Sequence, residues 1–176
     1  MGSGSGVSCS IGVSTGLTPE EQLLYQNPDV IADLLDRSKT IAIVGLSADR
    51  QKASFFVGSY LKYAGYRIIP VNPQYQEILG ERCYPDLGNI AFPVDIVDIF
   101  RPAHDCDEIV RKAIAIQARA VWMQLKIINL HAADTAQQAG LTVIMDKCIK
   151  MEHGRYAGTL HFSGMNTGII SARKRI

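Results

Sequence analysis

Five short apolar runs, separated by segments with helical patterns, constrain the fold more than any other feature of this sequence. The runs are rich in Val and Ile and apolar almost throughout, which is typical of parallel strands covered on both faces. They span Ile41–Val44, Arg67–Val71, Val94–Phe100, Ala120–Met123 and Thr142–Met145. Strands that alternate with helices form right-handed βαβ units. The sequence therefore predicts an α/β fold with a doubly wound parallel sheet of about five strands and helices on both faces.

The segments around these runs carry the start and stop signals of helices. Thr18-Pro19-Glu20-Glu21 combines an N-cap residue, a proline at the first helical position and acids in the first turn. Ser54 is expected to cap a helix over Phe55–Ala64. Helical patterns also cover Asp29–Leu35, Asp105–Ile116 and Asn129–Ala139. Residues 72–93 hold three of the seven prolines, and we expect a loop there with a short strand or turn near Ile78–Tyr84.

Length and composition fit one domain with an extension at each end. The 176 residues carry a net charge of +1, which gives no bulk attraction for nucleic acid or for an anionic membrane. No apolar run approaches the ~18 residues of a membrane span. We expect a flexible leader rich in Gly and Ser over residues 1–17, a domain with N-terminal helices over residues 18–154, and a tail over residues 155–176.

The four cysteines are scattered, without a C-x-x-C pair or a histidine at metal-ligand spacing. They are Cys9, Cys83, Cys106 and Cys148. This pattern predicts reduced thiols in a cytoplasmic protein and no metal site. Cys148 follows the last apolar run, where Lys147 and a helix N-terminus are expected to favour the thiolate. The more common role of such a cysteine is that of a small buried apolar side chain.

The first apolar run leads into a loop with the features of a phosphate site. Gly45 is expected to let the backbone approach a ligand, Arg50 and Lys52 add positive charge, and Ser54 opens a helix whose N-terminus offers unpaired N–H groups. The loop lacks the further glycines of G-x-G-x-x-G and the G-K-[ST] of a P-loop. It therefore predicts a site for a nucleotide-like anion outside the two commonest nucleotide-binding motifs.

Distinctive polar residues also follow the other runs. They are Asn72, Gln124 and Arg101, which has the setting of a buried residue. Ligands of open α/β sheets bind outside the carboxyl ends of the strands, at the topological switch point. Folds that bind NAD place an acidic residue at the end of the second strand to bond the ribose hydroxyls. Here that strand ends in Asn72-Pro73, which is compatible with a nucleotide phosphorylated on the ribose, such as NADP or coenzyme A.

The sequence resembles the small stand-alone CoA-binding proteins, which are similar to the N-terminal CoA-binding domain of the succinyl-CoA synthetase α-subunit. The resemblance covers about residues 34–152 and rests on an ordered set of motifs. These are Val44-Gly45-Leu46-Ser47, Pro70-Val71-Asn72-Pro73, Ile78-Leu79-Gly80-Glu81 with Tyr84, Val97-Asp98-Ile99-Phe100-Arg101, Val121-Trp122-Met123-Gln124 and Met145-Asp146-Lys147-Cys148-Ile149. It implies a Rossmann-like fold that binds coenzyme A, with diphosphate near the first loop and adenosine near the second and third strand ends.

The same resemblance implies roles for single residues. Phosphate contacts fall to Gly45, Ser47, Arg50, Lys52 and Ser54; the adenosine is flanked by Val71, Asn72 and Pro73; and the next strand end is lined by Phe100 and Arg101. Gln124 is a further candidate binding residue, from its place after the fourth run. Two positions depart from the pattern. Lys126 stands where many relatives have Gly, and Lys147 stands where Arg is usual. Whether Lys126 obstructs the pantetheine arm or adds a phosphate contact stays open.

Two classes of function follow. The first is non-catalytic binding of coenzyme A or acyl-CoA, as a sensor, carrier or partner module. The second is an enzyme, either an NADP-type oxidoreductase or a CoA-dependent transferase with an unrecognised active site. The synthetase needs a second domain with a phosphorylated histidine and a partner subunit, and the stretch after Gly154 is too short to supply that domain. No catalytic constellation is evident, which favours the first class. The expected partners are a small-molecule ligand and either a second copy of the chain or another protein.

Overall fold

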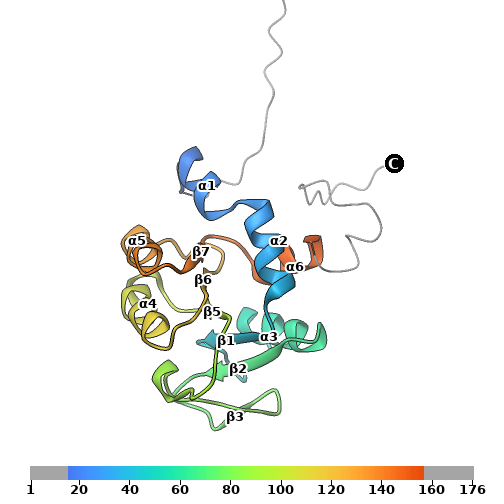
Figure 1. The fold of residues 1–176 in the computed structure, drawn as a ribbon. Coiled ribbons are helices and arrows are strands. Elements are labelled where there is room, and N and C mark those ends of the chain that lie inside the picture. Colours follow the sequence, from blue (N-terminus) through green and yellow to red (C-terminus); the bar gives the residue numbers. More distant parts are fainter. Residues whose placement is uncertain (1–15, 157–176) are drawn as a thin grey trace, which may run out of the picture.

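The computed structural model describes residues 16–156, in which five parallel strands form one sheet in the order β2-β1-β5-β6-β7 (Figure 1). The strands are β1 (Thr40–Val44), β2 (Arg67–Val71), β5 (Ile96–Ile99), β6 (Ala120–Met123) and β7 (Thr142–Ile144). The predicted α/β fold with a doubly wound parallel sheet is confirmed. Most of the expected leader and tail, residues 1–15 and 157–176, lies outside the described residues.

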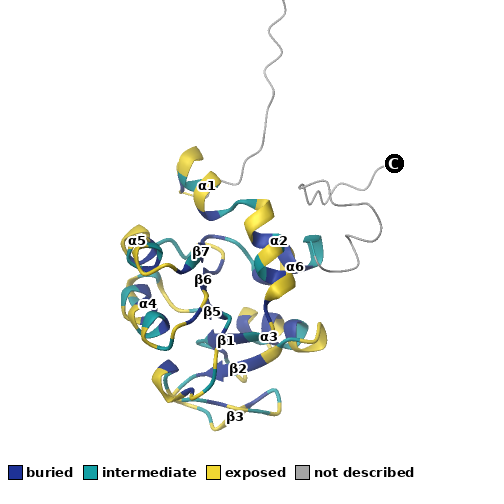
Figure 2. Cartoon of the chain, in the orientation of Figure 1, coloured by how far each residue is buried: buried dark blue, intermediate teal, exposed yellow. Residues whose placement is uncertain are grey.

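Helices cover both faces of this sheet (Figure 1). One face packs against α4 (Cys106–Ala115) and α5 (Leu130–Gln138), and the other against α2 (Pro28–Arg37), α3 (Ala53–Tyr63) and α6 (Ile149–Tyr156). Successive strand residues point to opposite faces, so Val121 enters the core under α4 and α5 while Trp122 enters the other. Figure 2 shows the resulting pattern, with buried strands between helices that are exposed on their outer sides.

Two helices precede the sheet, and their break lets the chain pass from one face to the other. Helix α1 (Pro19–Tyr25) begins with the predicted signals, because Thr18 Oγ1 accepts the Glu21 N–H and Glu21 Oε2 accepts the Thr18 N–H at 2.7 Å. Tyr25 belongs to the core under α4 and α5, whereas Ile31 of α2 belongs to the opposite core. Asn27 caps α2 between them. None of the described helices is both long and apolar enough to cross a membrane.

Helix α3 begins earlier than predicted, and Ser54 is not its cap. Lys52 occupies the N-cap position without a side-chain hydrogen bond to the helix. Ser54 lies inside the first turn and is buried, and its Oγ accepts the N–H of Ser47 at 3.2 Å. The prediction was wrong because this hydroxyl bonds the preceding loop instead of the N–H groups of its own helix.

The proline-containing stretch after β2 folds into short elements. β3 (Glu77–Ile78) and β4 (Glu81–Arg82) pair as a two-stranded antiparallel sheet, and the single turn η1 (Leu87–Asn89) follows. A bridge from Val71 to Tyr84 attaches this stretch to the end of β2. The expected short strand or turn near Ile78–Tyr84 is therefore confirmed. A further turn, η2 (Ala103–Asp105), separates β5 from α4.

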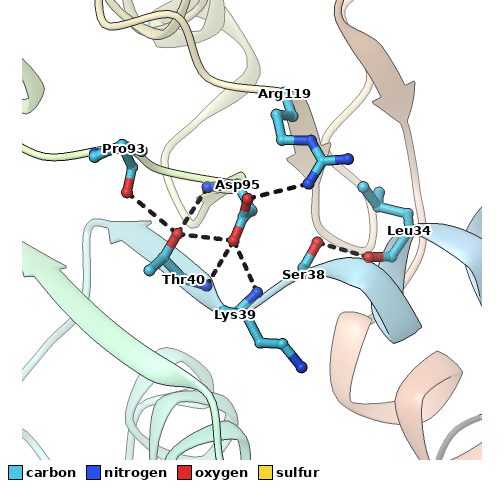
Figure 3. A network of polar contacts seen from close by, with 7 residues as sticks. All are labelled: Leu34, Ser38, Lys39, Thr40, Pro93, Asp95 and Arg119. Carbon is cyan, nitrogen blue, oxygen red and sulfur yellow. Dashed lines mark hydrogen bonds and ion pairs between the residues drawn. The ribbon is translucent and has the colours of Figure 1, made fainter.

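Asp95 joins β1 and β5 at the amino edge of the sheet (Figure 3). Its Oδ2 accepts hydrogen bonds from the N–H groups of Lys39 (2.8 Å) and Thr40 (2.9 Å) and from Thr40 Oγ1 (3.0 Å). Arg119, just before β6, approaches Oδ1 at 3.4 Å. Burial alone raises the pKa of this carboxyl, but the hydrogen bonds outweigh it and hold the pKa below its usual value. The carboxylate therefore fixes the start of β1 against β5.

We predict that Asp95→Ala lowers the free energy of unfolding by ~1–3 kcal/mol near neutral pH, because partly buried N–H groups lose their acceptor. A depressed pKa stabilises the folded state above the pKa of the unfolded chain, and that contribution disappears as the pH falls through the lower folded value. The cost of the substitution should therefore shrink in acid. Urea unfolding of the wild type and of Asp95→Ala, from neutral to acid pH, measures this difference in the free energy of unfolding.

The matched control is Asp33→Ala. Asp33 pairs only with Arg37 on the exposed side of α2, with 56% of its side chain exposed, so its loss should change stability by less than ~1 kcal/mol. Equal costs for the two variants, or a cost for Asp95→Ala that stays constant in acid, would contradict the assigned role.

Candidate functional site

A cavity of about 490 Å³ opens where the winding of the sheet reverses direction. β1 pairs with β2 on one side and β5 on the other, so Val44 lies opposite Val71 and Ile99 at the carboxyl edge. Such a switch point is where open α/β sheets bind ligands. The walls come from the ends of β1 and β2, the segment after β5, η1 and the first turns of α4. The topology therefore places a cavity where the sequence predicts a site.

The structure brings part of the predicted set into this cavity. Gly45, Val71, Asn72, Pro73 and Arg101 line it. The remaining candidates, Ser47, Arg50, Lys52, Ser54, Phe100 and Gln124, do not contribute to its walls. Ser47, Arg50 and Lys52 belong to the loop between β1 and α3, which leaves the cavity at Gly45, and Ser54 lies in the first turn of α3.

Gly45 is required by the protein's own backbone. Its φ is +86°, and its N–H donates to the carbonyl of Val71 at 2.9 Å. A Cβ at this position would lie 2.9 Å from the carbonyl oxygen of Phe100 and 3.0 Å from Cδ of Arg101. The expectation that Gly45 makes room for a ligand is therefore incomplete, because the space beside it is already filled by the segment that follows β5.

The loop after Gly45 is held in shape by side chains predicted to bind phosphate. Ser54 Oγ accepts the Ser47 N–H, and Ser47 Oγ accepts the Asp49 N–H at 3.1 Å. Arg50 and Lys52 follow in the same loop, are exposed, and form no ion pair within the described part of the chain. The serines thus fix the loop, while the two cations stay available for an anion.

Asn72 ties this loop to the end of β2. Its Nδ2 donates to the Leu46 carbonyl at 2.9 Å, and its Oδ1 accepts the Gln74 N–H at 3.0 Å. Both side-chain groups of Asn72 therefore have protein partners. Its part in the site is to hold two loops together at the mouth of the cavity.

Arg101 is exposed, which contradicts the prediction that it is buried. Its side chain is 53% exposed and pairs with Asp105 through Nε and Nη2, each 2.9 Å from Oδ2. The apolar residues before Arg101 belong to β5, but the side chain itself lies beyond the strand and reaches the carboxylate in η2. Arg101 therefore lines the cavity as one half of an ion pair.

A second ion-pair group on the cavity wall escaped the sequence analysis. Lys112 Nζ lies 2.5 Å from Asp86 Oδ2 and 2.6 Å from Glu108 Oε1. The hydrogen bond with Asp86 is the main reason that the pKa of Lys112 is raised, and the same bond lowers the pKa of Asp86. The i,i+4 spacing of Glu108 and Lys112 predicts an ion pair, and α4 follows β5 closely enough to place it at this edge. Asp86 could not be found in this way, since it comes from a distant loop.

Gln124 lies away from the cavity and binds a buried acid. Its Nε2 donates to Asp98 Oδ1 at 2.7 Å, and Asp98 is completely buried. Burial raises the pKa of Asp98 to about 8, against the lowering effect of Gln124, so the carboxyl is mostly protonated at neutral pH. Oδ2 has no hydrogen-bond partner among residues 16–156. Phe100 is half-buried and packs against the same core under α3 and α6.

The end of β7 places Cys148 directly before α6. Cys148 is half-buried, and the backbone N–H groups of Lys150 and Met151 act to lower the pKa of its thiol. Burial nevertheless raises the pKa of the thiol above its usual value, and Asp98 adds to the increase. The expectation that the thiolate is favoured here was therefore wrong, because desolvation outweighs the helix N-terminus. Lys147 is partly engaged by Glu152, at 3.8 Å.

Two further positions give the strand ends an unusual backbone. Lys126 after β6 has a φ of +65°, and Asp146 after β7 has a φ of +53°. Asp146 Oδ1 accepts the Lys126 N–H at 2.6 Å, so the carboxylate of Asp146 holds the backbone of Lys126 in place. Lys126 adopts the left-handed conformation that glycine adopts most easily.

We predict that Gly45→Ala destabilises the fold more than Gly140→Ala. The two glycines have nearly equal φ, +86° and +85°, but a Cβ at Gly140 meets nothing within 4 Å. Each variant incurs the ~1–2 kcal/mol cost of a left-handed residue with a Cβ, and only Gly45→Ala adds the clash with Phe100. Thermal or urea unfolding of the pair isolates the clash. Equal losses of stability would show that Phe100 moves aside.

We also predict that Asp98→Asn flattens the dependence of stability on pH. The folded pKa of about 8 lies above the unfolded value, so the folded state binds more protons between roughly pH 4 and 8. The free energy of unfolding of the wild type should therefore fall as the pH rises through this window, by up to ~1.4 kcal/mol per pH unit. Asn keeps the acceptor for Gln124 and does not titrate.

Unfolding in urea at several pH values compares the two proteins, and Asp98→Asn should be the more stable near pH 8. An unchanged slope would mean that Asp98 is ionised in the folded state. Asp33→Asn, on the exposed side of α2, controls for the general loss of a carboxylate.

The chain is similar to several known proteins. It matches the family model described as CoA binding domain over residues 39–154. The uncharacterized protein YneT of Bacillus subtilis (strain 168) is 39% identical over 130 residues, which cover 73% of this chain and 96% of YneT. A solved structure of a hypothetical protein from Pyrococcus horikoshii OT3 has 35% sequence identity and a TM-score of 0.72, and the match covers 82% of this chain and 96% of that one.

A larger protein contains a similar segment. The ADP-forming acetate–CoA ligase I of Archaeoglobus fulgidus is 26% identical over 135 residues, which cover 71% of this chain but only 20% of the ligase. The order of the motifs, the parallel sheet and these similarities agree. The chain belongs to the family of CoA binding domains.

Proposed function

We propose that this protein binds coenzyme A or acyl-CoA reversibly, without catalysing a reaction on it, as a sensor, carrier or partner module. The observation that carries the proposal is a cavity at the switch point of the sheet, next to a loop whose two cations have no described partner. Membership of the family of CoA binding domains supports the same ligand. The two parts of the site have different charge patterns, and these match the two ends of a nucleotide.

The cavity is suited to the nucleoside end. Its two cations, Arg101 and Lys112, are already neutralised by Asp105, Asp86 and Glu108. A diphosphate placed there would meet three carboxylates and would have to displace them. An adenine base and a ribose offer N–H and O–H donors to such acceptors. Apolar wall residues such as Val71, Pro73 and Ile109 supply surface for the base.

The loop between β1 and α3 is suited to the diphosphate end. Arg50 and Lys52 are exposed and unpaired within the described residues. The loop leads into the N-terminus of the 11-residue helix α3, which also favours an anion. Since the loop begins at Gly45 on the cavity wall, a nucleotide in the cavity places its diphosphate beside the loop.

Calorimetric titration tests the ligand. Coenzyme A should bind more tightly than NAD, because the second strand ends without the carboxylate that would hold an unphosphorylated ribose; NADP is titrated in parallel. NAD binding more tightly than coenzyme A, or no binding of coenzyme A, would overturn the proposal. NADP binding more tightly than coenzyme A would favour the oxidoreductase class instead.

The same titration tests the loop. Arg50→Ala should weaken the binding of coenzyme A by roughly 10- to 100-fold, the loss of a hydrogen bond to a charged group. Lys39→Ala is the matched control, because Lys39 is an exposed cation at the opposite, amino edge of the sheet. Neither exposed residue contributes to the core, so both variants should unfold like the wild type. Equal affinities for the two variants would show that the loop does not hold the phosphates.

A further inference from the structure

A second group of polar residues lies at the carboxyl edge of the sheet, on the face covered by α3 and α6. It comprises Asp98 in β5, Gln124 after β6 and Cys148 before α6. The cavity does not include these residues, and the proposed nucleotide contacts leave them unused. Three adjacent strands therefore end in chemically distinctive side chains beyond the nucleotide site.

The thiol of Cys148 lies at the positive end of α6. Cys148 directly precedes Ile149, the first residue of α6, and the backbone N–H groups of Lys150 and Met151 act to lower the pKa of its thiol. The residue is only half-buried, whereas Cys83 and Cys106 are fully buried. Among the cysteines of the described residues, Cys148 is the one that a solute reaches most easily.

Asp98 supplies an independent indication that this place receives a ligand atom. Its carboxyl is completely buried, Oδ1 is bound by Gln124, and Oδ2 has no partner within residues 16–156. Buried polar atoms without a hydrogen bond are rare in folded proteins and need an explanation. Asp98 pairs in register with Trp122, whose Nε1 donates to the carbonyl of Lys147, the residue before Cys148, at 2.7 Å. An unused polar atom and a thiol thus lie together under α6.

The position relative to the cavity connects this group with the proposed ligand. All five strands are parallel, so their carboxyl ends share one edge, with the cavity at β1, β2 and β5 and Cys148 after β7. Coenzyme A carries its sulfur at the end of a long flexible arm that starts at the diphosphate. An arm that starts at the loop after β1 would pass the ends of β5 and β6 before it reaches Cys148.

We propose that Cys148 is a thiol–disulfide exchange site, at which the sulfur of a bound CoA disulfide is captured as a protein–CoA mixed disulfide. The inference rests on the proposed function, since the nucleotide site delivers the disulfide. The Cys148 thiolate attacks one sulfur of the CoA disulfide, and a new S–S bond forms as the old one breaks. The departing CoA leaves as a thiolate and takes up the proton that Cys148 has lost, so the disulfide is the only oxidant needed.

The surroundings of the thiol set the pH dependence of this exchange. Burial raises the pKa of Cys148, Asp98 from β5 raises it further, and the Lys150 charge on α6 lowers it. Lys147 and Glu152 form a pair beside it. The reactive thiolate is therefore a minor species at neutral pH, and exchange should accelerate as the solution becomes alkaline. Binding in the nucleotide site compensates through a high local concentration of the disulfide.

Intact-protein mass spectrometry of the full chain tests the proposal, with CoA disulfide and glutathione disulfide as parallel probes. CoA disulfide should add one CoA moiety to the wild type at least ~10-fold faster than glutathione disulfide adds glutathione, because only the former is held by the nucleotide site. The adduct should disappear in Cys148→Ser, which replaces only the sulfur by an oxygen. It should persist in Cys9→Ser, Cys83→Ser and Cys106→Ser.

Each alternative outcome counts against the proposal. No adduct, an adduct on another cysteine, or equal rates with the two disulfides would overturn it. Calorimetry with reduced coenzyme A on Cys148→Ser separates the two claims. If this variant binds coenzyme A while the wild type forms no adduct, the exchange site is refuted and reversible binding stands. If coenzyme A does not bind and the two disulfides react equally, both claims fail.

Discussion

The parallel pairing of β1 with β2 on one side and β5 on the other is the constraint on which the rest of the structure depends. It reverses the winding of the chain, so the segments after β1 and β5 diverge and leave a cavity between them. At the amino edge, Asp95 fixes the start of β1 against β5 by accepting the backbone N–H of Thr40. At the carboxyl edge, Gly45 directly follows β1. Its N–H donates to the Val71 carbonyl, and it lies against the carbonyl of Phe100. The contacts that fix these strands and the ligand site therefore involve the same three strands, β2, β1 and β5.

Much of this fold could be predicted because each buried strand is a separate apolar run. β2 and β6 begin and end where their runs do. The predicted run Val94–Phe100 is longer than β5, which spans Ile96–Ile99. Asp95 bonds the backbone at the amino edge of the sheet through its carboxylate, so regular pairing starts at Ile96. The predicted N-cap role of Ser54 was wrong for a similar reason. Serine is a common N-cap residue, but the hydroxyl of Ser54 accepts the partly buried N–H of Ser47 instead. Both errors arise where a tertiary hydrogen bond replaces a local one.

The residues of the candidate site also fall into two groups: those that sequence could place and those that depend on tertiary packing. Residues that directly follow a strand, such as Gly45 and Asn72, were placed at the cavity from sequence because the edge of a parallel sheet is shared by all its strands. Asp86 was not, since it comes from the loop before η1 and reaches Lys112 only after α4 has packed on the sheet. The exposure of Arg101 depends likewise on its pairing with Asp105, which the apolar character of β5 does not reveal. Sequence thus locates the edge, and packing decides which charges face one another there.

These internal pairings bear on how a nucleotide would be held. The backbone of the loop after β1 is fixed before any ligand arrives, because Ser47 bonds Ser54 and Leu46 bonds Asn72. Binding would therefore order few backbone groups, and the conformational cost falls mainly on the side chains of Arg50 and Lys52. On the cavity wall the charges are matched in advance, which leaves acceptors for the base and ribose but no surplus cation for the diphosphate. The strongest charge interaction with a ligand is thus confined to the loop, and it is the step of binding most sensitive to salt.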